Sequence, residues 1–275
     1  MRKVKIKKIR KLPKGDRYDL TVPETSNFFA NGILIHNTSQ RTGYVKYDNR
    51  SWWQRLLRFE PSYQIVTGTR NVVKNPVNFN RNDLEGGYYS GTNFRKEAQN
   101  RVVKNGLKKD EVIYYEVAGF SGPNTPIMPD HKLKWSELKA AGFTKEEFEK
   151  LKENYGETVT YHYGCNKGEF DIRVYRITQN GVDLSDKEMR ERCEELDLTP
   201  VEYLGTFNTN DDLMEISKEL AEQHEEHQIR EGVCLRLEDS EGKLLKIVKY
   251  KSFLFACLEG IQANSEKYVN LEEIS

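Results

Sequence analysis

Long apolar runs are missing from this 275-residue sequence. No stretch approaches the roughly 18 to 20 consecutive apolar residues that a membrane-spanning helix needs. The basic N-terminus also lacks the apolar core of a secretory signal peptide. These absences argue against a membrane partner, and we expect a cytoplasmic protein, in a bacterial or phage-infected cell.

Cysteine is scarce, and its spacing is uninformative for metal binding. The four cysteines contain no CxxC pair, and the five histidines are scattered. This pattern offers no zinc-ligand spacing. We therefore expect the cysteines to be small buried side chains in a reducing compartment.

Net charge is also absent, because 43 basic residues balance 43 acidic ones. The balance conceals an asymmetry: residues 1–37 carry nine Lys or Arg and three acids, a net charge of +6. Residues 38–275 must then carry −6. A break of this kind predicts two modules with different partners.

The end of the basic segment has residue types that can cut a polypeptide. Residues 18–22 read Tyr-Asp-Leu-Thr-Val, residues 27–32 read Asn-Phe-Phe-Ala-Asn-Gly, and three apolar residues then lead to His-Asn-Thr at 36–38. An asparagine side chain can attack its own backbone carbonyl. A hydroxyl just downstream can accept an acyl group.

This arrangement resembles the C-terminal motif of inteins of the Hint family. The resemblance implies that residues 1–37 are an all-β C-terminal split-intein fragment that excises itself. It assigns chain cleavage to Asn37, proton donation to His36, acyl acceptance to Thr38, and orientation or activation of Thr38 to Asp19.

Two details complete this interpretation. Ser26 stands where many family members carry a histidine, and Asn31-Gly32 predicts a tight hairpin turn. Since the chain begins at Met1, we expect the N-terminal intein half on another polypeptide, whose acidic surface would attract the +6 segment. The alternative interpretation is a small β-hairpin ahead of an ordinary domain.

Hydrophobic periodicity in the second module predicts a mixed α and β structure, of the α+β class. Ser136 and Ser185 are the expected N-caps of the first two helices. The expected helices cover 136–154, 185–196 and 209–223, and the expected strands cover 63–67, 112–119, 169–177, 231–237 and 244–249.

Charged and aromatic residues interrupt several of these strands. Glu116 lies in an apolar strand, where an unpaired carboxylate would be costly. Tyr175 lies in the next strand, and Glu231 begins the run Glu-Gly-Val-Cys-Leu-Arg. Lys249 and Lys251 are two residues apart on a strand, so they point to one face and can converge on one phosphate.

The order of these segments resembles the nucleotidyltransferase motifs of ATP-dependent ligases. The segment at 119–127 and the Lys-Tyr-Lys-Ser ending look most like phage-type RNA ligases. The resemblance implies that residues 38–275 are the C-terminal part of such a ligase, an incomplete domain of antiparallel sheets with flanking helices. ATP, Mg²⁺ or Mn²⁺, and RNA are the implied cofactors and partner.

The same resemblance assigns roles within the nucleotide site. Glu231 would contact the metal or the lysine nucleophile. The nucleotide-binding residues would be Glu116 at the ribose, Tyr175 on the adenine, Lys249 and Lys251 at the α-phosphate, and Arg70 at the phosphates or the nucleic-acid end.

One essential residue of the ligase family is missing. These enzymes form lysyl-AMP on a lysine in Lys-x-Asp-Gly or Lys-x-His-Gly, and neither motif occurs here. Residues 38–43 look like the run just after that motif. We therefore expect the lysine on the partner chain, so that splicing ahead of Thr38 restores the site.

Other readings of the second module stay open. It is alternatively half of a DNA ligase or of a capping guanylyltransferase, or a non-catalytic RNA-binding protein with a basic N-terminal hairpin. RNA is favoured over DNA because no room remains after residue 275 for the additional domain typical of DNA ligases. The −6 charge argues against a purely phosphate-binding role.

Overall fold

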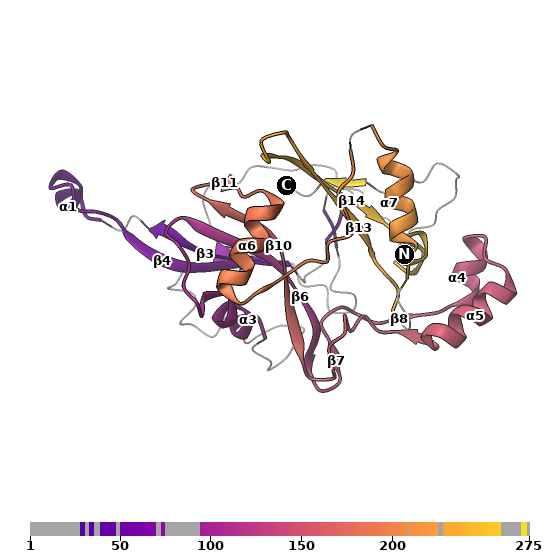
Figure 1. Ribbon diagram of the computed structural model, residues 1–275. Helices are drawn as coiled ribbons and strands as arrows, with labels where there is room; N and C mark the ends of the chain where they lie inside the picture. The colour runs from indigo at the N-terminus through magenta and orange to yellow at the C-terminus, as the bar shows by residue number, and fades with distance from the viewer. Residues whose placement is uncertain are drawn as a thin grey trace, which may run out of the picture.

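The computed structural model describes residues 28–30, 33–35, 39–47, 50–69, 73–74, 94–208, 210–224, 228–259 and 271–273. Its largest unit within these residues is an eight-stranded sheet with the order β11-β10-β6-β3-β4-β5, to which β12 and β7 also pair (Figure 1). Pairing is antiparallel except between β10 and β12. The strands of this sheet are β3 (Ser39–Tyr47), β4 (Ser62–Thr69), β5 (Val73–Lys74), β6 (Glu111–Gly122), β7 (Thr125–Pro126), β10 (Phe170–Gln179), β11 (Val182–Asp183) and β12 (Thr199–Pro200).

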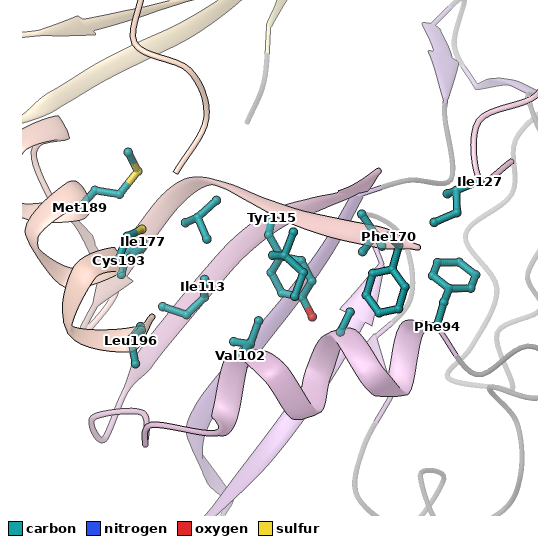
Figure 2. Close-up of a cluster of buried hydrophobic side chains, with 14 residues drawn as sticks. Phe94, Val102, Ile113, Tyr115, Ile127, Phe170, Ile177, Met189, Cys193 and Leu196 are labelled. Carbon is teal, nitrogen blue, oxygen red and sulfur yellow. The ribbon is translucent and has the colours of Figure 1, made fainter. Parts of the chain in front are cut away.

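Two helices, α3 (Phe94–Val103) and α6 (Asp186–Leu196), pack their apolar residues on one face of this sheet. Figure 2 shows side chains from both helices directed at the central strands β6 and β10. Those labelled on the helices are Phe94, Val102, Met189, Cys193 and Leu196.

Strand β3 contributes polar residues to this core. Gln40 and Thr42 are buried, and both hydrogen-bond the hydroxyl of Tyr115, at 2.7 and 2.8 Å. Burial raises the pKa of Tyr115, so the hydroxyl stays protonated and can take part in this network. A buried polar group that is fully bonded fixes the register of the strands around it.

A second core lies beside the large sheet. Helices α4 (Trp135–Ala140), α5 (Lys145–Tyr155) and α8 (Phe253–Leu258) surround it, together with strands β8 (His131–Lys132) and β9 (Thr158–Val159). Its fully buried aromatic rings are Tyr161 and Phe255.

A small sheet completes the described part of the second module. It has the order β13-β14-β15, formed by β13 (Gly232–Glu238), β14 (Leu244–Lys251) and β15 (Leu271–Glu273). Helix α7 (Leu213–Ala221) packs against β13 and β14.

Near the N-terminus, β1 (Phe28–Ala30) and β2 (Ile33–Ile35) form an antiparallel hairpin. Ala30 pairs with Ile33, so the connection has two residues, as the Asn31-Gly32 sequence predicts. The hairpin is common to the intein interpretation and to its alternative, so it does not distinguish them.

The mixed architecture with antiparallel sheets and helices confirms the expected α+β class, and all five predicted strands are present. One helix prediction is wrong: the expected 136–154 helix is two helices, α4 and α5. Its expected cap Ser136 lies inside α4, whose N-cap is Lys134. Among the described residues, no helix has the length and apolar character to cross a bilayer.

The cysteine expectation is confirmed for two of the four residues. Cys193 and Cys257 are buried, which raises the pKa of each thiol to about 11. Cys165 is half-buried, and Cys234 is exposed on β13. All four are free thiols.

Candidate active site

The face of the large sheet opposite α3 and α6 carries polar and aromatic side chains. On β6 and β10 the residues alternate, so Tyr115 and Val174 enter the core while their neighbours point to the other face. The neighbours on this second face are half-buried: Tyr114, Glu116, Asp171, Arg173 and Tyr175. Two of the residues predicted for nucleotide binding, Glu116 and Tyr175, thus share one face.

Glu116 lies in the middle of β6, opposite Ser39 of β3 on one side and Arg173 of β10 on the other. The hydroxyl of Ser39 donates a hydrogen bond to the Glu116 carboxylate. This bond stabilises a half-buried acid that would otherwise be costly. It also brings the residue that follows Thr38 into contact with the predicted ribose-binding acid.

Tyr175 sits at a β-bulge. The pairing of β10 with β6 jumps between Val174 and Arg176, which leaves Tyr175 as the extra residue. Its ring centroid lies 6.4 Å from that of Tyr114. Bulges re-aim side chains and are frequent beside active sites.

Arg176, the residue after Tyr175, belongs to a structural pair. Its Nη2 lies 3.0 Å from Oδ2 of Asp183, and its guanidinium lies 4.8 Å from the Tyr114 ring centroid. The hydrogen bonds that Arg176 donates to Asp183 raise the pKa of Arg176. The charge of Arg176 is therefore directed at β11.

Glu231 and Lys249 form the second group, at the small sheet. Nζ of Lys249 lies 3.4 Å from Oε2 of Glu231, and these side chains are 21% and 24% exposed. The hydroxyl of Tyr163 donates to the other carboxylate oxygen. Burial, and next the charge of Glu231, raise the pKa of the neighbouring Tyr161.

Tyr163 is itself held in place from two sides. Its backbone N–H donates to Oε1 of Gln228 at 2.7 Å, and its hydroxyl oxygen lies 3.3 Å from the sulfur of Met128. The orientation of Glu231 therefore depends on a segment far from it in sequence. An acid fixed in this way is preorganised to meet a cation.

Lys251 lies two residues along β14 from Lys249, on the same face, as predicted. Its environment differs, because its Nζ is 2.9 Å from Oε2 of Glu259 and both side chains are almost fully buried. The two lysines thus have different acidic partners in this state. The phosphate role of Lys251 stays a prediction.

The lysine-bearing face of the small sheet is turned toward the edge of the large sheet. Arg236, on this face, donates to the carbonyl of Leu184, between β11 and α6. The N–H of Asp186 donates to Glu238 at 2.8 Å. These bonds tie β13 to the unit that carries Glu116 and Tyr175.

The second group offers a divalent cation one carboxylate ligand, that of Glu231, rather than a complete set of protein ligands. No group of three or more His, Cys, Asp or Glu side chains is arranged for a metal within the described ranges. Mg²⁺ commonly binds through one or two carboxylates plus phosphates and waters. Glu231 fits such a site, because its side chain is partly exposed.

Five predicted site residues lie outside the part of the chain that the structure describes. They are Asp19, His36, Asn37, Thr38 and Arg70. Their assigned roles stay predictions.

Sequence reasoning missed three residues that contact the predicted ones. Ser39, Tyr163 and Glu259 bond Glu116, Glu231 and Lys251 respectively. Only Ser39 carried a sequence signal, since it belongs to the run 38–43, which looks like the segment just after the ligase lysine motif.

Comparison with known families supports part of this picture. The family described as RNA ligase matches residues 127–251, less than half of the chain. The match ends at Lys251, and it includes Tyr175, Glu231 and Lys249 while leaving Glu116 outside. Residues 127–251 are thus an RNA ligase-type region, which supports ligase activity in general.

Searches of curated proteins and of solved structures found no significant match.

Proposed function

We propose that this chain is a trans-splicing precursor of an ATP-dependent RNA ligase. Residues 1–37 are a C-terminal split-intein fragment, and residues 38–275 are the C-terminal part of the ligase. The lysine that accepts AMP is on a separate polypeptide, because neither Lys-x-Asp-Gly nor Lys-x-His-Gly occurs in this sequence.

The observation that carries the proposal is the contact of Ser39 with Glu116. In the proposed ligase, Thr38 is joined to the segment that bears the nucleophilic lysine. A ribose-binding acid must lie close to that lysine. The contact therefore lies where the ligase would need the lysine-bearing segment to be joined to this chain.

Splicing would use residues on either side of the junction. The upstream acyl group, carried as an ester or thioester on the first Cys or Ser of the partner's intein half, passes to the hydroxyl of Thr38, which Asp19 orients. The bond to that Cys or Ser breaks, its side chain leaves, and an ester forms on Thr38. The side-chain nitrogen of Asn37 then attacks its own carbonyl carbon and breaks the bond to Thr38, while His36 supplies a proton. The freed amine of Thr38 takes the acyl group from its ester, which leaves an ordinary peptide bond.

Ligation would use the two groups on the sheets. Glu116 binds the ribose and Tyr175 stacks on the adenine of ATP. Lys249, Lys251 and Arg70 neutralise the phosphates, and Glu231 would hold a Mg²⁺ or Mn²⁺ ion, which would supply positive charge at the reacting phosphate. AMP passes to the lysine and pyrophosphate leaves.

The test of splicing mixes the chain with its complementary half and follows the products by mass. We expect a joined protein and a free 37-residue peptide. Asn37→Ala should abolish release of the peptide, whereas Asn208→Ala, in an exposed loop, should not change it. Release at an equal rate from Asn37→Ala would rule out the intein assignment.

The test of ligase activity incubates the joined protein with labelled nucleotide. We expect covalent AMP from ATP on the joined protein, none on the unspliced chain, and sealing of RNA ends. Labelling by GTP or sealing of DNA alone would favour another nucleotidyltransferase. RNA binding without any labelling would favour the non-catalytic alternative.

A further inference from the structure

Large apolar side chains gather on the surface at the tip of the β3–β4 hairpin. This tip carries α1 (Trp52–Leu56), which has no buried residue and lies at one end of the molecule (Figure 1). The most exposed members are Trp52, Trp53, Leu56, Leu57 and Phe59, each between 57% and 67% exposed. We call residues 50–60 the hairpin tip. Clustered exposure of this kind usually marks a binding surface.

The hairpin tip has a defined local structure. Ser51 and Gln54 form a capping box at the start of α1. The N–H of Phe59 donates to the carbonyl of Gln54 at 2.9 Å, and Nη1 of Arg50 donates to the carbonyl of Phe59 at 2.5 Å. The exposed rings are therefore held on a closed turn.

The chemistry of the hairpin tip suits single-stranded nucleic acid. The rings of Trp52 and Trp53 are stacked, with centroids 3.7 Å apart. The hairpin tip also contains three arginines, Arg50, Arg55 and Arg58, and one acid, Glu60, in a module whose net charge is −6. Aromatic rings that stack on bases, combined with arginines that meet phosphates, are the usual elements of single-strand binding.

We propose that the hairpin tip binds single-stranded RNA by stacking of bases on Trp52 and Trp53. This inference rests on the proposed ligase function, and it adds a substrate contact away from the reacting end. Strand β3 connects the two sites, because it begins at Ser39 beside Glu116 and leads at Tyr47 to the tip.

The length of β3 sets how much RNA the contact requires. Nine residues of an antiparallel strand span about 27 Å at about 3.4 Å per residue. A stacked strand rises about 3.4 Å per nucleotide, so the length of β3 alone corresponds to about eight nucleotides between the Glu116 site and the hairpin tip. Substrates much shorter than this cannot touch both sites.

The binding experiment uses the full chain with Trp135→Phe, since the sequence has three tryptophans and the other two are at the tip. Single-stranded RNA of about 20 nucleotides should quench the remaining fluorescence. Affinity, measured by anisotropy of labelled RNA, should fall at least about tenfold in Trp52→Ala/Trp53→Ala. Arg55→Gln/Arg58→Gln should weaken binding and flatten its salt dependence.

Leu56→Ala/Leu57→Ala is the matched control, because it removes exposed apolar surface from the same tip without removing a ring. We expect its RNA affinity to stay unchanged. If the tryptophan variant also binds RNA normally, the inference is overturned. If either variant instead loses self-association or binding to the ligase N-terminal half, the surface docks protein.

The outcomes separate this inference from the proposed function. If the spliced protein forms lysyl-AMP but binds RNA independently of Trp52 and Trp53, only the hairpin-tip inference is wrong. If RNA binding depends on the tryptophans but no adenylation occurs, only the ligase proposal is wrong. In the active enzyme, the defect of the tryptophan variant should vanish with substrates of about four nucleotides.

Discussion

Glu231 is held by two residues that approach it from different parts of the chain. Tyr163 donates to one carboxylate oxygen, and Lys249 lies 3.4 Å from the other. About a quarter of the Glu231 side chain remains exposed. The acid is thus oriented while it still has access to a ligand, which a group that stabilises a transition state requires.

Glu231→Gln keeps the shape of this side chain and removes its charge. In the spliced protein, formation of covalent AMP should fall at least about 100-fold, because a preorganised charge at the phosphate is lost. Labelled-AMP incorporation measures this. Glu219→Gln, an exposed acid on α7, is the control and should keep normal labelling. Equal labelling of both variants would show that Glu231 has no part in the formation of covalent AMP.

The sequence predicted Glu231 and Lys249 because their motif is local and their strand alternates. It did not predict Tyr163, which is 68 residues from Glu231. Tyr163 also has a positive φ of 50°, which is uncommon for a residue other than glycine and has no signal in residue type. Such contacts depend on the tertiary fold, which periodicity does not report.

Secondary-structure elements show a different limit of sequence reasoning. The run 136–154 has helical periodicity, but Gly142 adopts a φ of 99° and interrupts it. Thr144 and Glu147 then form a capping box that begins α5. The sequence Thr-x-x-Glu is the usual pattern of a capping box, and it indicates a helix start more strongly than the apolar periodicity of 136–154 indicates one continuous helix.

Strand β3 escaped prediction for another reason. Its two core-facing residues near Tyr115 are Gln40 and Thr42, which are polar. The strand therefore lacks the apolar alternation that marks a half-buried strand. Hydrogen bonds to the Tyr115 hydroxyl, the Arg95 carbonyl and the Thr67 hydroxyl make the burial of these polar side chains favourable.

Gly232, at the start of β13, leaves no room for a side chain against the backbone of β14. It has a φ of 152°, and a Cβ there would lie 2.0 Å from the carbonyl oxygen of Tyr250. Gly232→Ala should lower the free energy of unfolding by more than about 3 kcal/mol, from backbone strain plus the displaced strand. Urea unfolding followed by circular dichroism measures the change.

Gly106→Ala is the control for this prediction. Its φ of 83° is also unfavourable for alanine, but a Cβ there would meet nothing within 4 Å. We expect the free energy of unfolding to fall by about 1 kcal/mol, from backbone conformation alone. Similar losses in the two variants would mean that the contact with Tyr250 is unimportant.

The whole chain combines a +6 segment with a −6 remainder. If residues 1–37 meet an acidic partner half, the association rate should fall about tenfold as ionic strength rises from about 0.05 to about 0.5 M. Stopped-flow measurement of fragment association tests this. Replacing Lys3, Lys5 and Lys7 by glutamine should flatten the salt dependence, and an unchanged slope would show that charge does not steer the encounter.

At this scale the sequence predicted the class of fold but not the arrangement of its strands. The α+β class follows from the mixture of periodicities. The order β11-β10-β6-β3-β4-β5 does not, because it pairs β3 with β6, whose partner residues Ser39 and Glu116 are 77 positions apart. Long-range pairing of this kind is decided by packing and by bonds such as that of Gln40 to Tyr115.

Strand β3 has neighbours on both sides, β6 and β4, and its first residue follows the proposed splice junction directly. A segment joined there would prolong a strand that is already anchored, and would not have to insert itself between two others. Splicing would then lengthen an existing strand, and the sheet already formed would set the direction of the joined segment.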